Sequence, residues 1–279
     1  LPAAPRGDHV RRRGEDLAIG DTVFSAGVRL GAWDLGVLAA LGVADVPVAR
    51  APRVALLATG DELVPVTTEP APGQLVDSSM HSLAALVTEC GGTPVRIGIV
   101  RDEPAVLADK LAEALEHDVV ITTGGVSVGE RDHVHAALAA TGVSLELWKV
   151  AMKPGKPFSF GMRAQTPVFG LPGNPVSTLV AFELFLRPAL LAMQGAAITT
   201  RPRATVTLAA GYRKQPGRAH YVRVRVRRTG DQLVAEPHGK QGSAMLSSLL
   251  GCNALVELAA ELGDVPPGGT CPALLLEAV

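Results

Sequence analysis

Residues 119–132 read VVITTGGVSVGERD, a short apolar run followed at once by a glycine-rich loop and then by a helical pattern. The run Val119 to Thr123 has the composition of a fully buried strand. Glycines after such a strand let backbone N–H groups converge, and a helix N-terminus adds partial positive charge, so this loop suits a phosphate. Because it is neither the dinucleotide fingerprint nor a P-loop, a tight turn that binds nothing stays open as the alternative.

Strand and helix signals alternate on both sides of this loop. The predicted strands lie at 54–59, 95–100, 119–123 and 145–150, with a hairpin of 157–162 against 167–169. The predicted helices lie at 79–90, 104–116 and 132–140, with a long one from Val176. This alternation predicts an α/β domain over residues 51–195, a mostly parallel sheet with helices on both faces.

The flanking regions follow different patterns. In residues 1–50, Thr22–Phe24 and Val28–Leu30 flank a Ser-Ala-Gly turn as a hairpin does, and 32–41 has helical spacing. We expect this region to be the C-terminal remnant of an N-terminal β-rich domain. Beyond Pro202 the pattern has period two, most clearly in Tyr221–Arg227, so residues 196–279 are predicted to form a small all-β, barrel-like domain.

Composition limits the classes of function. The 279 residues suggest about two domains at roughly 150 residues each. With 26 Lys+Arg against 27 Asp+Glu and 4% aromatic residues, neither a nucleic-acid partner nor a membrane surface is expected. Three cysteines without zinc-ligand spacing indicate a reduced, cytoplasmic protein. Glu183 and Arg187 interrupt the apolar stretch 176–193 at helical spacing, which favours a soluble helix over a membrane span.

Acidic residues follow successive predicted strands. Asp61 and Glu62 come after the first, Asp102 after the second, and Asp132 after the glycine loop. The carboxyl ends of parallel strands form a ligand crevice, so these carboxylates could converge there and hold Mg²⁺ beside phosphate oxygens. The alternative is that each acid merely caps a helix.

Basic residues form two further groups. Lys149, Lys153 and Lys156 lie in a proline-restricted segment that could hold a second oxyanion, or be an exposed polar loop. Arg223 belongs to a row at every second residue, which either binds an oxyanion or blunts an edge strand with charge.

Several segments occur together in one order: Thr59–Leu63, Asp77-Ser78, Thr122–Gly129 with Asp132, Lys153–Pro157 and Gly170–Pro175. This set resembles the molybdopterin molybdenumtransferases, the MoeA family, and the resemblance covers nearly the whole chain. It implies insertion of molybdate into the dithiolene of adenylylated molybdopterin, with release of AMP, in a Mg²⁺-dependent step of molybdenum cofactor biosynthesis. It also implies a homodimer, with the pathway's adenylyltransferase and molybdoenzymes as partners.

The resemblance further implies roles for individual residues. The catalytic set would be Asp16, Glu62, Asp102, Asp132, Lys149 and Lys153, and the metal ligands among them Glu62, Asp102 and Asp132. The pterin substrate would contact Thr59, Gly60, Asp61, Asp77, Ser78, Thr123, Gly124, Gly125, Val126, Ser127, Gly129, Pro172, Asn174 and Pro175. Molybdate would contact Lys153, Lys156, Pro157, Arg223 and Ser243.

Two alternatives to this function follow from the same residues. A molybdopterin adenylyltransferase shares the central fold but favours a Gly-Gly-Thr-Gly loop and needs no β domain, so 126–128 and 202–279 argue against it. A non-catalytic molybdopterin-binding scaffold is disfavoured because the acids and lysines are all present. Family members begin well upstream of Leu1, so we expect this sequence to lack an N-terminal part.

Overall fold

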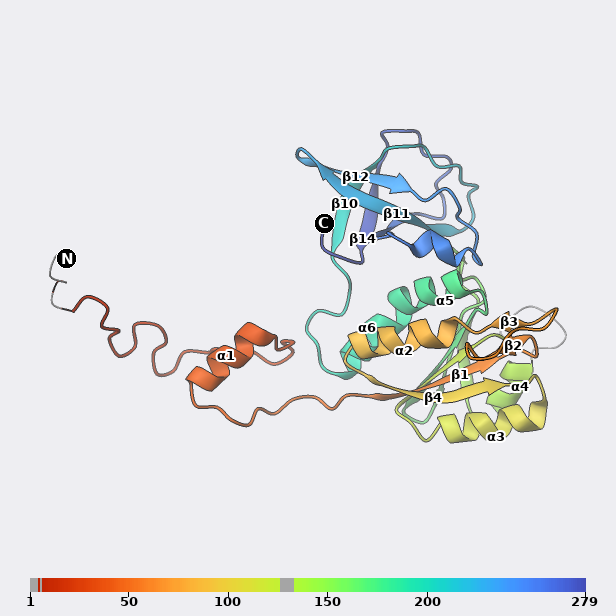
Figure 1. The fold of residues 1–279 in the computed structure, drawn as a ribbon, viewed down its shortest axis with the longest axis horizontal. Coiled ribbons are helices and arrows are strands. Elements are labelled where there is room, and N and C mark those ends of the chain that lie inside the picture. The colour runs from red at the N-terminus through yellow and green to blue at the C-terminus, as the bar shows by residue number, and fades with distance from the viewer. Residues whose placement is uncertain (1–4, 6, 126–132) are drawn as a thin grey trace.

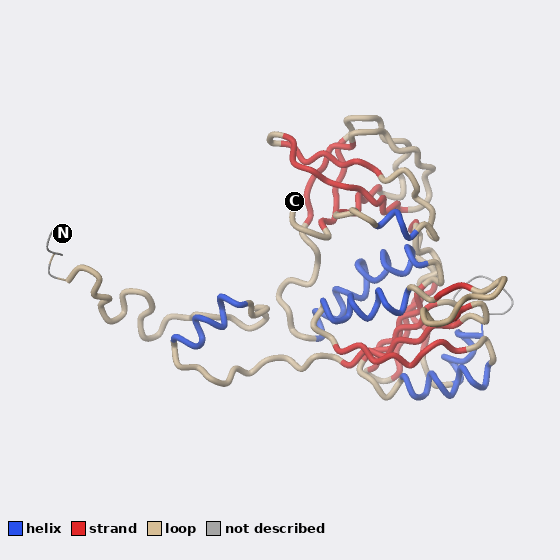
Figure 2. Tube along the Cα trace, viewed as in Figure 1, coloured by secondary structure: helices blue, strands red, loops and turns tan. Residues whose placement is uncertain are grey.

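The computed structural model describes residues 5, 7–125 and 133–279, with no account of the His133 side chain. An α/β domain lies below a β-barrel, and an N-terminal stretch extends to one side (Figure 1). In Figure 2 that stretch is loop apart from one helix, whereas the rest of the chain is dense in helices and strands.

The α/β domain is built on a six-stranded sheet in the order β4-β1-β5-β9-β8-β6. The four parallel strands are β4 (Thr93–Val100), β1 (Arg53–Thr59), β5 (Val119–Thr123) and β9 (Thr166–Leu171). Antiparallel pairing adds β8 (Ser159–Arg163) and β6 (Ser144–Trp148). The predicted mostly parallel sheet is confirmed.

Helices cover both faces of this sheet (Figure 1). One face carries α2 (Ser79–Glu89), α5 (Pro175–Ala181) and α6 (Arg187–Met193), the last two joined by a π-helical turn (Phe182–Leu186); the other carries α3 (Pro104–Ala114) and α4 (His133–Ala140). Alternation along β1 divides its side chains between two cores. Leu56 packs with Leu83 and Phe182, while Leu57 packs with Leu107 and Leu111. Burial on both faces explains why this strand is apolar throughout.

The helical stretch Pro175–Met193 is long and apolar enough to cross a membrane by length and composition, but more than half of it, 56%, is buried inside the structure. Its two charged side chains are paired: Glu183 lies 3.0 Å from Arg201, and Arg187 lies 3.4 Å from Glu89. Burial and paired charges are the properties of a core helix.

The C-terminal barrel confirms the predicted small β domain. Its strands are β10 (Arg203–Leu208), β11 (Ala219–Thr229), β12 (Gln232–Pro237), β13 (Ala254–Leu258) and β14 (Thr270–Leu275). They pair in the order β12-β10-β14-β13-β11, and pairing of β11 with β12 closes the ring. Val222, Val224 and Val226 fill its interior. The short β7 (Met152–Lys153) comes from the α/β domain and pairs in parallel with the start of β11.

The hairpin predicted at 22–30 is wrong. These residues are described and form no strand, and α1 (Ala32–Ala40) is the one regular element between residues 7 and 52. A two-stranded hairpin is marginal without a neighbouring sheet to pack on. Here the backbone bonds elsewhere instead, for example from Ala197 N to Gly27 O at 2.9 Å. The expectation of β structure in this region therefore fails for the described residues.

Candidate functional site

The carboxyl ends of β1 and β5 open into a pocket of about 630 Å³. Most of the residues predicted to contact pterin or metal line it. They are Thr59, Gly60, Glu62, Asp77, Ser78, Asp102, Thr123, Gly124, Gly125, Pro172, Asn174 and Pro175, with Pro157 from the lysine segment. Sequence reasoning missed Leu63, Leu75, Val76, Ser79, Gly173, Ala244 and Leu246. The pocket lies where ligands bind in open α/β sheets.

Close approach of the loops after β1 and β5 explains the pair Gly124-Gly125. Gly124 has a φ of +85°, and a Cβ there would lie 2.2 Å from the carbonyl oxygen of Thr59. A Cβ on Gly125, with φ +62°, would lie 2.1 Å from Val134 Cγ2. Only glycine allows this backbone path and this proximity. The predicted contacts Val126, Ser127 and Gly129 lie outside the described residues, so the phosphate cradle stays a prediction.

Two predicted metal ligands face the same pocket. Glu62 is exposed on the loop after β1, and Asp102 is partly buried on the loop after β4. Asp61 connects these loops, because its Oδ1 accepts a hydrogen bond from Asp102 N at 3.2 Å. Within the described ranges no three His, Cys, Asp or Glu side chains form a metal-binding group, and the third predicted ligand, Asp132, lies outside them. Carboxylate oxygens are the donors that Mg²⁺ prefers, so Glu62 and Asp102 fit such a site.

Asp77 is a helix cap at the pocket wall. The short strands β2 (Leu63–Val64) and β3 (Leu75–Val76) pair in parallel and lead the chain to this point. The buried Asp77 carboxylate accepts hydrogen bonds from Ser79 N at 2.9 Å and Met80 N at 3.2 Å. It thus satisfies N–H groups that the first turn of α2 leaves without partners.

The structure does not gather the three lysines in this pocket. Lys149 places its Nζ 3.7 Å from the ring centroid of Trp148, a cation–π contact. Lys153 is exposed on β7 and lines a different pocket, beside the barrel. Lys156 is exposed, and only Pro157 reaches the pocket wall. Pairing of β7 with β11 draws Lys153 toward the barrel.

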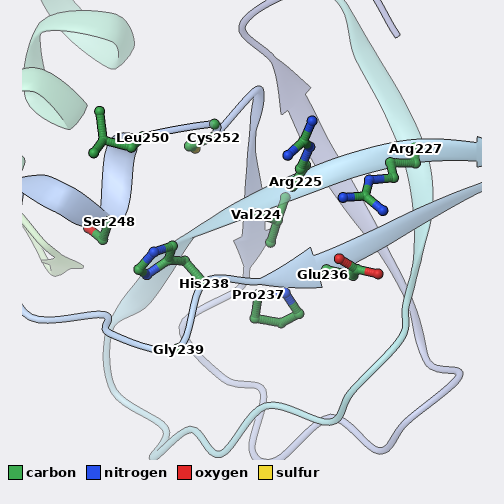
Figure 3. Close-up of a pocket in the computed structure, with 11 residues that line it drawn as sticks. Val224, Arg225, Arg227, Glu236, Pro237, His238, Gly239, Ser248, Leu250 and Cys252 are labelled. Atoms are coloured by element: carbon green, nitrogen blue, oxygen red, sulfur yellow. The ribbon is translucent and has the colours of Figure 1, made fainter.

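The arginine row lies on the outer face of β11, as period two requires, but its members differ in environment. Arg225 and Arg227 are exposed and, with Glu236 from β12, line a pocket of about 340 Å³ (Figure 3). Arg223 has no exposed surface, because the 240–248 loop covers it. Burial lowers the pKa of its guanidinium.

The Arg223 side chain donates its hydrogen bonds to the loop that covers it. Its Nε donates to Ser248 Oγ at 2.7 Å, and its Nη2 donates to Lys240 O at 3.3 Å and Gly242 O at 3.2 Å. Ser248 lies in a 3₁₀ turn, Leu246–Leu249. In this structure Arg223 therefore fixes a loop rather than facing the pocket.

Gln241 is a structural residue that sequence reasoning missed. Its side chain replaces a strand partner, accepting from Arg223 N at 3.1 Å and donating to Arg223 O at 2.9 Å. Next to it, Ser243 O accepts a hydrogen bond from Val176 N at 3.1 Å, at the start of α5. The loop so placed brings Ala244 and Leu246 into the pocket wall. The barrel thereby completes a pocket that begins in the α/β domain.

Asp16 is exposed and lines none of these pockets. It lies in the N-terminal stretch that extends away from the α/β domain (Figure 1). The structure does not bring it to the other predicted catalytic residues, since the hydrogen bonds of the neighbouring described residues are all local, as between Arg12 and Glu15.

Three family models match the chain in consecutive order. Residues 1–42 match the MoeA N-terminal region (domain I and II), 55–192 match the probable molybdopterin binding domain, and 205–276 match the MoeA C-terminal region (domain IV). Together they cover both domains described above.

Individual relatives agree with these matches. The chain is 36% identical to a molybdopterin molybdenumtransferase of Haemophilus influenzae, over 94% of this chain and 65% of that protein. It is 35% identical to molybdopterin molybdenumtransferase 2 of Mycobacterium tuberculosis, over 95% and 66%. A crystal structure of the molybdopterin biosynthesis MoeA protein from Pyrococcus horikoshii aligns with a TM-score of 0.83 at 29% identity, covering 95% of this chain and 65% of that one. The chain thus spans just under two thirds of the length of these relatives.

Proposed function

This chain belongs to the MoeA family, and on that premise we propose that it transfers molybdenum from molybdate to adenylylated molybdopterin, with release of AMP. The observation that carries the proposal is the pocket at the carboxyl edge of the sheet, where three glycine-bearing loops, the carboxylates of Glu62, Asp77 and Asp102 and the barrel loop meet. Its volume and its mixture of polar and apolar lining residues suit a phosphorylated, ring-containing substrate.

The pterin substrate is held by the loops after β1, β5 and β9 in this proposal. Backbone N–H groups near Gly124 and Gly125 would bind its phosphate, since no side chain blocks their approach. Asn174 and Pro175 would contact it from the loop after β9. Glu62 and Asp102, with Asp132, would hold Mg²⁺, which when bound supplies positive charge to the phosphates.

Molybdate is held on the barrel side of the pocket in this proposal. Pro157 reaches the pocket wall, and Lys153 and Lys156 lie on the same short segment. Ser243 stands beside Ala244, which lines the wall. The reaction needs no protein nucleophile, because positioning of the two substrates and stabilisation of developing charge account for catalysis. Arg223 contributes by keeping the loop of Ser243 in place.

We include a homodimer, contacts with the pathway's adenylyltransferase and molybdoenzymes, and a cytoplasmic location in this proposal. Support for the dimer comes from α1, where Trp33 is 91% exposed and Leu35 is 57% exposed. Apolar side chains gathered at a surface mark a contact site. Support for a reducing compartment comes from Cys90, Cys252 and Cys271, which are all free thiols.

The test is AMP release from adenylylated molybdopterin, measured with and without molybdate, on this chain and on an N-terminally extended one. Asp132→Asn and Lys153→Ala are expected to reduce turnover by about a hundredfold or more. Asp109→Asn and Lys110→Ala, on the far face at α3, serve as matched controls. Unchanged turnover in the first pair contradicts the site assignment. Tight binding of the adenylylated pterin without AMP release would favour the scaffold alternative.

A further inference from the structure

The polar pocket of about 340 Å³ on the outer face of the barrel lies between β11, the end of β12 and the loop that follows the 3₁₀ turn (Figure 3). The side chains that give it its character are Arg225 and Arg227 from β11, Glu236 and His238 from the end of β12 and just beyond, and Leu250 from the loop. None of the five lines the pterin pocket, and none belongs to the residues proposed above for pterin, metal or molybdate. The pocket is therefore separate from the proposed active site.

The charged side chains of this pocket are free to bind a partner. Arg225 and Arg227 are exposed on the same face of β11, and Arg225 pairs in register with Glu236 on β12. Among the residues that the structure describes, none of these three side chains has an ion-pair partner within 4.0 Å. Two unpaired guanidinium groups in one concave site favour a ligand that carries negative charge.

Two further polar groups limit what that ligand can be. Glu236 offers a carboxylate, which accepts hydrogen bonds and repels a second anion placed beside it. His238 Nδ1 accepts a hydrogen bond from Lys240 N at 3.3 Å, so the neutral ring carries its proton on Nε2 and can donate from there. A ligand that satisfies the whole pocket must therefore bring a carboxylate for the arginines and an N–H donor for Glu236.

The backbone beneath the two arginines is held rigidly. Val226, which lies between them, donates from its N to Asn253 Oδ1 at 2.7 Å, and Asn253 Nδ2 donates to Val226 O at 3.0 Å. On the adjoining loop Gly251 has a φ of +71°, and a Cβ there would lie 3.8 Å from Arg225 Nη1. Because this backbone is already ordered, less entropy is lost when a partner binds.

Leu250 gives the pocket an apolar rim. Its side chain is 79% exposed, and its N donates a hydrogen bond to Ser247 O at 3.2 Å, which fixes the turn that presents it. A single exposed leucine is common on protein surfaces, but this one lies in the same pocket as two unpaired arginines. Arginines beside apolar side chains are typical of protein–protein interfaces.

We propose that this pocket docks an extended acidic segment of a partner protein, in which a carboxylate side chain lies next to an apolar one. The carboxylate binds the forked donors of Arg225 and Arg227, and the apolar side chain covers Leu250. Backbone N–H groups of the segment donate to Glu236.

A phosphate-rich partner such as RNA fits this pocket less well. Glu236 would face its negative charge, and His238 is the one aromatic ring among the lining residues on which a base could stack. A small divalent anion meets the same repulsion from Glu236. The proposal goes beyond molybdenum transfer and does not depend on it.

The first experiment measures fluorescence anisotropy of a short labelled peptide of alternating Asp and Leu, titrated with the whole chain at pH 7. We expect saturable binding that weakens as ionic strength rises. A peptide of the same length with Lys in place of Asp should bind at least tenfold more weakly, because it brings no carboxylate to the arginines. Inorganic phosphate should displace the Asp peptide no better than sodium chloride of equal ionic strength.

The second experiment repeats the titration with variants. Arg225→Gln/Arg227→Gln should lower the affinity for the Asp peptide at least tenfold, and Leu250→Ser about fivefold. Arg213→Gln/Arg218→Gln removes the same charge from exposed positions that line no part of this pocket, so it should leave the affinity within twofold. All these variants should keep the thermal midpoint of the parent, since the replaced side chains are exposed.

Four results would overturn the proposal. They are no saturable binding of the Asp peptide, equal affinity for the Lys peptide, equal affinity in Arg225→Gln/Arg227→Gln, and tighter binding of a single-stranded RNA oligonucleotide than of the Asp peptide. Because AMP release is not measured, an inactive chain that binds the Asp peptide as described leaves the proposal standing.

Discussion

Replacing Arg223 with methionine removes a buried cation that holds the 240–248 loop against β11. The guanidinium donates three hydrogen bonds, to Ser248 Oγ and to the carbonyls of Lys240 and Gly242. Bonds from charged donors stabilise a fold by about 1.5–3 kcal/mol each. Methionine, however, avoids burying a charge that has no counter-ion among the described residues. We expect a net loss of about 3 kcal/mol in the free energy of unfolding, since both effects operate.

Two measurements can detect this loss of unfolding free energy. For a urea m value of about 2 kcal/mol/M, the midpoint of unfolding should fall by about 1.5 M. The amide of Val176 should exchange roughly a hundredfold faster, because its acceptor, Ser243 O, lies on the released loop. Arg225→Met is the matched control, since Arg225 is exposed on the same strand and the same face.

The opposite pattern would refute the reasoning. If Arg223→Met leaves the urea midpoint and the protection of Val176 as they are, yet abolishes molybdate-dependent AMP release, then Arg223 contacts substrate. Its burial under the loop would then not describe the working enzyme. Arg223→Lys sharpens the comparison, because lysine keeps the charge but cannot reproduce the forked set of donors.

Three further outcomes are expected. Gly124→Ala should destabilise by more than about 2 kcal/mol and weaken binding of adenylylated pterin in a direct titration, because its Cβ would meet Thr59 O. Gly142→Ala is the control, because Gly142 has a similar φ of +81° but an added Cβ would meet no atom within 4 Å. An equally large loss of stability in Gly142→Ala would mean that φ alone, and not the contact with Thr59, causes the effect. Asp77→Ala should lower the thermal midpoint by the equivalent of about 1 kcal/mol, with partial rescue by asparagine, since the residue caps α2. Arg50 pairs with Asp118 at 2.6 Å and helps to lower the pKa of that carboxyl to about 2. Stability from this pair is present above the unfolded pKa and is lost as pH falls from about 4 to 2. Asp118→Asn should therefore be less stable at neutral pH, with urea midpoints that approach the parent's only as the pH falls to about 2; a constant difference would contradict this.

Most of the α/β domain could be predicted from the sequence because its signals are local. The buried run Val119–Thr123 is observed with the predicted bounds, and α3 begins at Pro104 as expected. Each depends on the side chains of one segment, which record burial or amphipathicity directly. The prediction of a hairpin at 22–30 was wrong because it also used local pattern alone. A strand pattern that has no neighbouring sheet to pair with does not form a strand.

The candidate site was less predictable where it depends on distant contacts. The end-of-strand rule correctly placed Glu62 and Asp102 at one pocket. No spacing could show that a loop after β12 folds over Arg223, or that Gln241 would pair with its backbone. Period two gave the correct face of β11 but not what covers it. Likewise, a two-residue strand such as β7 carries too little pattern to reveal its partner.

The pairing of β7 with β11 also bears on how the protein can be divided. At His220, β11 pairs with β13 on one side and with β7 on the other, and β7 also pairs with Ala219. A barrel expressed alone, from residue 203 onward, would expose that second edge, to which strands of other molecules could add. Such a fragment should associate and precipitate even though its ring of five strands is closed. Two residues of the neighbouring domain, Met152 and Lys153, thus cover the one edge that the ring of strands leaves open.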